Sequence, residues 1–141
     1  MNNEKNTLFV ILSWLWLSIV IVASLVPKPK SYVRQMIKKL LRIMGTPEMD
    51  KNVHFIFYFL LVFFFIMAYK STKWRTFIFV GAIVISGIIE VIQPMVTHSS
   101  RKCDFNDFMY NISGCLLGLV LALSFEFFYN SFQNRIATVH I

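Results

Sequence analysis

The sequence has little charge and very few acidic residues. Charged residues make up 15% of the 141 positions and only seven residues are Asp or Glu, whereas 57% are hydrophobic. Soluble domains carry about 25% charged residues. The low charge, together with long uncharged runs, excludes an ordinary soluble domain and a disordered chain. It predicts one small integral membrane domain over residues 1–141.

The sequence also lacks the motifs of several function classes. Cys103 and Cys115 are the only cysteines and form no CxxC pair, which argues against a disulfide scaffold or a zinc ribbon. No nucleophilic-serine motif, phosphate-cradling loop or HExxH is present. The sequence therefore does not decide whether the protein is an enzyme, and we predict no cofactor and no metal site, although its carboxylates and histidine have the chemistry to bind a divalent cation.

The net charge of +7 comes from Lys and Arg in short segments between apolar runs. Basic side chains in such segments meet anionic lipid headgroups. Because no groove-reading motif accompanies them, we expect the protein to bind membrane lipid and not nucleic acid.

Four apolar runs are long enough to span a bilayer. They cover residues 8–26, 54–69, 74–92 and 108–128. Continuous runs suit helices and not the alternating strands of a barrel, so the sequence predicts an all-α, multi-pass membrane protein. The alternative for the first run is a signal peptide, but its uncharged core is longer than the usual 7–15 residues.

Residues 31–44 separate the first two runs and form an amphipathic pattern. Apolar residues recur at spacings of three and four, and the basic residues fall on the other face. The pattern predicts an interfacial helix lying on the membrane, with a docking helix in solvent as the alternative. Gly45 and Pro47 would end it.

Polar residues gather where three of the predicted spanning helices meet one side of the membrane. Antiparallel packing places the start of the second run, the end of the third and the start of the fourth on that side. Each run carries its polar residues as a helical stripe: Asp50, His54 and Tyr58; Glu90 and Gln93; Asp104, Asp107 and Asn111. We expect these stripes, with the cations Lys51 and Arg101, to line a polar pocket that binds substrate or lipid. Gly114 and Gly118 continue the last stripe and would let helices approach closely.

Simpler structural roles remain open for several of these residues. Asp104 or Asp107 would also serve as the cap of the fourth helix, Asn111 and Gln93 as interhelical hydrogen-bond partners, and His54 as a partner of Asp50. Glu90 is harder to explain in this way, because a carboxylate near a helix C-terminus opposes the helix dipole. If the protein is an enzyme, Glu90, His54 and Asp107 are the candidate catalytic residues.

The sequence resembles the VanZ-like family of small bacterial membrane proteins, which is named after a teicoplanin-resistance protein. The matching segments are DKNVHFIFY at 50–58, EVIQP at 90–94 and RKCDFNDFMYNISGCLLG at 101–118. The resemblance covers about residues 8–128, and the basic amphipathic segment departs from the family pattern. It implies a location in the bacterial inner membrane and work at the cell envelope, on peptidoglycan precursors or their lipid carrier.

The two membrane sides differ in their basic residues. The side of the polar stripes holds nine Lys and Arg residues, and the other side holds five. Because the side richer in Lys and Arg usually faces the cytoplasm, these counts place the stripes on the cytoplasmic side. Without the four in the amphipathic segment the counts are equal. The resemblance implies a cytoplasmic N-terminus, so we expect the stripes to face outward.

Three functions are consistent with this sequence. The first is a protein that binds or modulates a lipid-linked envelope precursor. The second is an intramembrane enzyme of lipid-carrier chemistry that uses the Glu, Asp and His residues. The third is a small transporter or channel, which would have to form a homo-oligomer because four helices make too thin a wall for a permeation path. A scaffold for a larger membrane complex is the remaining alternative.

Overall fold

The computed structural model describes residues 6–25, 49–97 and 103–139, and these form four helices. The helices are α1 (Thr7–Leu25), α3 (Met49–Ala68), α4 (Thr72–Val96) and α5 (Phe105–Val139). Each is long and apolar enough to cross a membrane, which confirms the expected multi-pass, all-helical architecture. The predicted interfacial helix at 31–44 lies outside the described residues.

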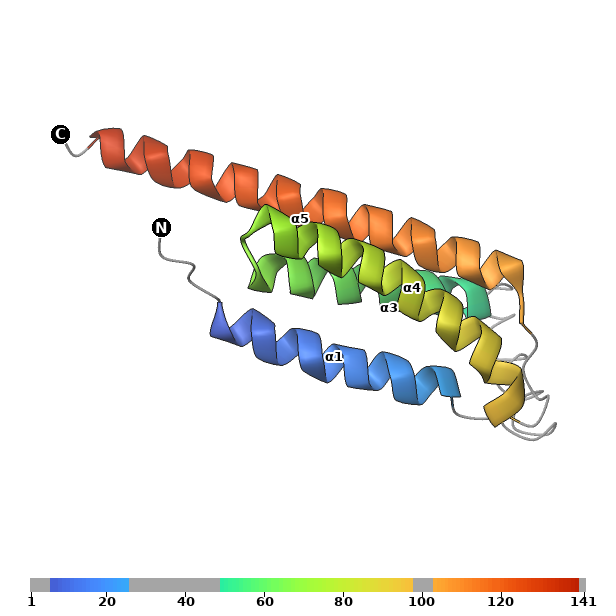
Figure 1. The fold of residues 1–141 in the computed structure, drawn as a ribbon. Coiled ribbons are helices and arrows are strands. Elements are labelled where there is room, and N and C mark those ends of the chain that lie inside the picture. The colour runs from blue at the N-terminus through green and yellow to red at the C-terminus, as the bar shows by residue number, and fades with distance from the viewer. Residues whose placement is uncertain (1–5, 26–48, 98–102, 140–141) are drawn as a thin grey trace.

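The helices form an elongated bundle (Figure 1). The α3 and α4 helices are joined by only three residues, 69–71, so they form an antiparallel pair. Large apolar side chains are exposed along all four helices; examples are Trp14, Ile56, Phe77 and Phe127. An exposed apolar surface of this extent suits lipid and not water.

The α3 and α5 helices approach each other most closely, at two glycines of α5. A methyl group added at Gly118 would lie 2.5 Å from the carbonyl oxygen of Phe59, and one added at Gly114 would collide with the carbonyl oxygen of Phe55. Only glycine leaves room for the α3 backbone at these two positions. The pair therefore forms the close helix contact that the sequence predicts, in the Gly-x-x-x-Gly spacing.

The α1 helix packs against the Phe-rich α3 through aromatic side chains. The indole N–H of Trp16 donates a hydrogen bond to the carbonyl oxygen of Phe57 at 2.9 Å, and the two rings meet edge to face. Trp14 makes a similar contact with Phe65. These contacts confirm that the phenylalanines of α3 serve packing.

The structure extends several predicted helix boundaries. The α4 helix continues through Pro94 to Val96, where the N–H and the hydroxyl of Thr97 both donate to the carbonyl oxygen of Gln93. The α5 helix begins at Phe105, three residues before the predicted start, and ends eleven residues after the predicted end. At 35 residues it is about 52 Å long. It therefore exceeds a hydrocarbon core of about 30 Å, and its C-terminal part extends beyond the other helices (Figure 1).

Candidate functional site: a buried polar cluster at one end of the bundle

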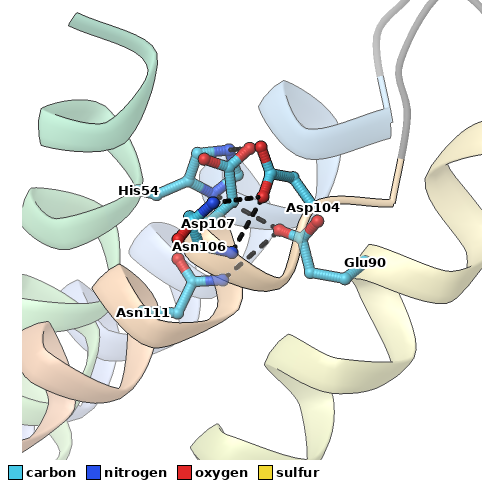
Figure 2. Close-up of polar contacts among 6 residues, drawn as sticks. All are labelled: His54, Glu90, Asp104, Asn106, Asp107 and Asn111. Carbon is cyan, nitrogen blue, oxygen red and sulfur yellow. Dashed lines mark hydrogen bonds and ion pairs between the residues drawn. The ribbon is translucent and has the colours of Figure 1, made fainter. Parts of the chain in front are cut away.

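The start of α3, the end of α4 and the start of α5 lie at the same end of the bundle (Figure 1). This arrangement brings together polar residues that are far apart in the sequence. His54 comes from the second turn of α3, Glu90 from the last two turns of α4, and Asp107 from the first turn of α5. Figure 2 shows the three side chains converging.

His54 lies between the two carboxylates. Its Nδ1 is 3.7 Å from Oε1 of Glu90, and its Nε2 is 3.7 Å from Oδ2 of Asp107. The side chains of His54, Glu90 and Asp107 are 9%, 3% and 18% exposed, so Asp107 is the member closest to the surface. Two carboxylates are thus held against opposite edges of one nearly buried imidazole ring. We call these three residues the triad.

Asn111 extends the triad by one turn of α5. Its Nδ2 donates to Oε1 of Glu90 at 3.5 Å, and its side chain is completely buried (Figure 2). This contact fixes the orientation of the amide, because the opposite orientation would turn an oxygen toward the carboxylate. The Oδ1 of Asn111 consequently points away from Glu90, and it has no hydrogen-bond partner among the described residues.

A second layer of polar groups lies one helical turn deeper in the bundle. Tyr58 follows His54 by four residues, Ser86 precedes Glu90 by four, and Asn111 follows Asp107 by four. All three are at most 1% exposed. Within the described residues, no hydrogen bond reaches the hydroxyls of Tyr58 and Ser86 or Oδ1 of Asn111. An unsatisfied buried polar group costs about 1–3 kcal/mol, so hydrogen bonds from water or from a bound molecule would stabilise these three side chains.

Other predicted site residues have different positions. Gln93 is 2% exposed, and its Nε2 has no partner among the described residues. The ammonium group of Lys51 lies 5.7 Å from the centre of the Tyr110 ring. Arg101 lies outside the described residues, and so does the side chain of Asp50.

Asp104 caps the α5 helix. Its Oδ1 accepts the backbone N–H of Asn106 at 2.8 Å and the Asn106 side-chain amide at 3.1 Å. Its carbonyl oxygen accepts the N–H of Phe108 at 3.2 Å. These bonds satisfy donors at the start of the helix, so the structure supports the capping role for Asp104.

Sequence reasoning missed two features of the polar framework. Ser86 was not singled out, although its spacing of four from Glu90 places it on the same face of α4. The second feature is an ion pair between Arg75 and Glu126, in which Nη2 of Arg75 donates to Oε2 of Glu126 at 2.5 Å. This pair joins α4 to α5 at the end of the bundle opposite the triad.

The chemistry of the cluster follows from its atoms. Carboxylate and amide oxygens accept hydrogen bonds, imidazole both donates and accepts, and hydroxyls do either. An imidazole between two carboxylates has the elements of a proton relay. The triad also offers one ligand atom from each residue, and these atoms lie within 4.8 Å of one another.

The comparisons with known proteins support the family resemblance. The family model described as VanZ/LLP1 matches residues 7–129. This range contains all four helices through most of α5, the triad and the second layer. No curated protein and no solved structure matches the chain.

Proposed function

The chain belongs to the VanZ/LLP1 family, and we propose that it binds a lipid-linked precursor of the bacterial cell envelope. The polar headgroup would occupy the triad end of the bundle, and the lipid tail would lie along the apolar helix faces. The observation that carries this proposal is the buried triad with its second layer of unsatisfied polar groups, at one end of an otherwise apolar bundle.

The chemistry of the cluster suits a headgroup rich in hydroxyl and amide groups. The triad and Asn111 supply acceptors for O–H and N–H donors, while the Tyr58 and Ser86 hydroxyls are available to either kind of partner. Lys51, in the first turn of α3, provides a positive charge for a phosphate near the surface. A sugar or peptide headgroup joined to a lipid through phosphate combines these groups.

The exposed faces of the helices would hold the tail. The side chains of Ile88, Val91 and Met95 are 51%, 60% and 75% exposed on the half of α4 that leads to the triad end. Phe105 and Met109 are exposed at the start of α5. A lipid whose headgroup enters the triad end would therefore find an apolar surface directly beside it.

The proposal is tested by the lipid that co-purifies with the protein. Native mass spectrometry of the full chain should detect a retained lipid, and Glu90→Gln should reduce its occupancy at least tenfold, since the change removes a charged acceptor and keeps the shape. Glu126→Gln is the matched control because it makes the same change at the opposite end of the bundle. Equal occupancy in wild type and Glu90→Gln, or equal loss in both variants, would contradict headgroup binding at the triad.

The position of His54 favours a second candidate function, catalysis on the lipid carrier. Its two ring nitrogens face different carboxylates, so the ring could pass a proton between Glu90 and Asp107. In this case Glu90 acts as the base, and His54 and Asp107 assist it. Purified protein with envelope lipids would then release a product that Glu90→Gln does not release. Stable lipid in the presence of folded wild-type protein would favour binding alone.

A further inference from the structure

The unsatisfied second layer and the arrangement of the triad carry an inference beyond headgroup binding. We propose that His54, Glu90 and Asp107 bind one divalent cation, with Asn111 holding Glu90 in place through its side-chain amide. The site is the one proposed for the headgroup, but the ion does not depend on the identity of that lipid.

The triad has ligand types and spacings that an ion requires. Metal–ligand bonds of about 2.0–2.2 Å place neighbouring ligand atoms about 3–4 Å apart. The contacts of His54 with the two carboxylates each measure 3.7 Å, but they use different ring nitrogens, so an ion bound by one nitrogen takes only one of these contacts as a ligand separation. The three ligand atoms lie within 4.8 Å of one another, so a modest side-chain rotation brings all three within bonding distance of one ion.

The second layer provides independent support for an occupant. Oδ1 of Asn111 is an acceptor in a fully buried side chain, it has no hydrogen-bond partner among the described residues, and the amide is held against Glu90 in the cluster. The hydroxyls of Tyr58 and Ser86, four residues from His54 and from Glu90, also have no hydrogen-bond partner among the described residues. Water molecules bound to an ion are donors of the kind that such buried oxygen atoms require.

The ligand set favours an ion that accepts both imidazole and carboxylate. Carboxylate oxygens suit Mn²⁺, Mg²⁺ and Ca²⁺, and imidazole together with carboxylate also suits Zn²⁺; of these ions, Mn²⁺ is the one that electron paramagnetic resonance detects. Mn²⁺ is therefore the probe. Mg²⁺ should compete only weakly, because it is reluctant to exchange its water for nitrogen.

The test is a Mn²⁺ titration of the chelator-treated full chain in phosphatidylcholine nanodiscs, followed by electron paramagnetic resonance. A zwitterionic bilayer without envelope lipid separates this experiment from headgroup binding. Wild type should bind one Mn²⁺ per chain. Asp107→Asn should weaken binding at least tenfold, Asn111→Ala should weaken it less, and Glu126→Gln should bind as wild type does.

Absence of saturable Mn²⁺ binding by wild type would overturn the ion site, and so would wild-type affinity in Asp107→Asn. A gain in thermal stability on adding Mn²⁺ that wild type shows and Asp107→Asn lacks would support the site, and a cooperative melting transition of the variant shows that it is folded. If the protein does not bind Mn²⁺, the headgroup proposal is still tested separately, by the lipid that co-purifies with the protein. Loss of lipid in Glu90→Gln without any Mn²⁺ binding would refute the ion alone.

Discussion

Close packing of α3 against α5 makes a sharp prediction at Gly118. A methyl group at this position would lie 2.5 Å from the carbonyl oxygen of Phe59, whereas ordinary contact begins at 3.4 Å. The helices would have to separate locally by about 0.9 Å, the difference between these distances, because a backbone oxygen cannot rotate away. Overpacking of this kind costs about 1–3 kcal/mol of the free energy of unfolding.

Gly114 should respond in the same way, since its added methyl group would meet backbone atoms of both Phe55 and Phe59. Gly81 in α4 is the matched control: a methyl group there finds no atom within 4 Å. Gly81→Ala should therefore be neutral or slightly stabilising, because alanine favours a helix more than glycine does.

Thermal unfolding of the purified variants in detergent measures the difference. Gly114→Ala and Gly118→Ala should each lower Tm by about 4–12 °C, taking about 4 °C for each kcal/mol, and Gly81→Ala should leave it within about 2 °C of wild type. If all three variants melt together, the α3 and α5 backbones are not in contact at the two glycines, and the packing described above is wrong.

Three further substitutions test other contacts by the same thermal unfolding measurement. Arg75→Ala should destabilise the bundle by about 1–3 kcal/mol, because it leaves the partly buried Glu126 without its charged hydrogen-bond donor; an unchanged Tm would show that the pair contributes nothing. Asp104→Ala should cost about 1 kcal/mol as the loss of a helix cap, and it should leave lipid retention unchanged, whereas loss of the lipid would assign Asp104 to the site. Trp16→Phe should cost about 1 kcal/mol through the loss of one hydrogen bond to α3, and a cost near zero would argue against that bond.

Much of the cluster could be predicted from spacing alone. Antiparallel helices with short connections force their alternate ends to the same side, and residues four apart share a helix face. These two rules predict that His54, Glu90, Asp107 and Asn111 lie together, and the structure places them in contact. The close approach at the glycines of α5 follows from the same face of the helix.

The remaining features depend on details that helical spacing does not contain. Spacing alone left Asp104 either as a cap or as a site residue, and only the bond from the Asn106 N–H separates the two. The pairing of Arg75 with Glu126 depends on how α4 is rotated against α5. The C-terminal part of α5 was missed because an apolar run marks the length of a membrane span, whereas the helix continues where no proline or glycine interrupts it.

Binding of an envelope precursor at the outer leaflet requires the triad to face outward, and one measurement tests this orientation directly. Cys103 is exposed beside the start of α5, whereas Cys115 is buried. In a Cys115→Ser variant, a membrane-impermeant maleimide should label Cys103 in intact cells as completely as it does in permeabilised cells. Labelling that occurs only after permeabilisation would contradict the outward position and would move the proposed headgroup site to the cytoplasmic leaflet.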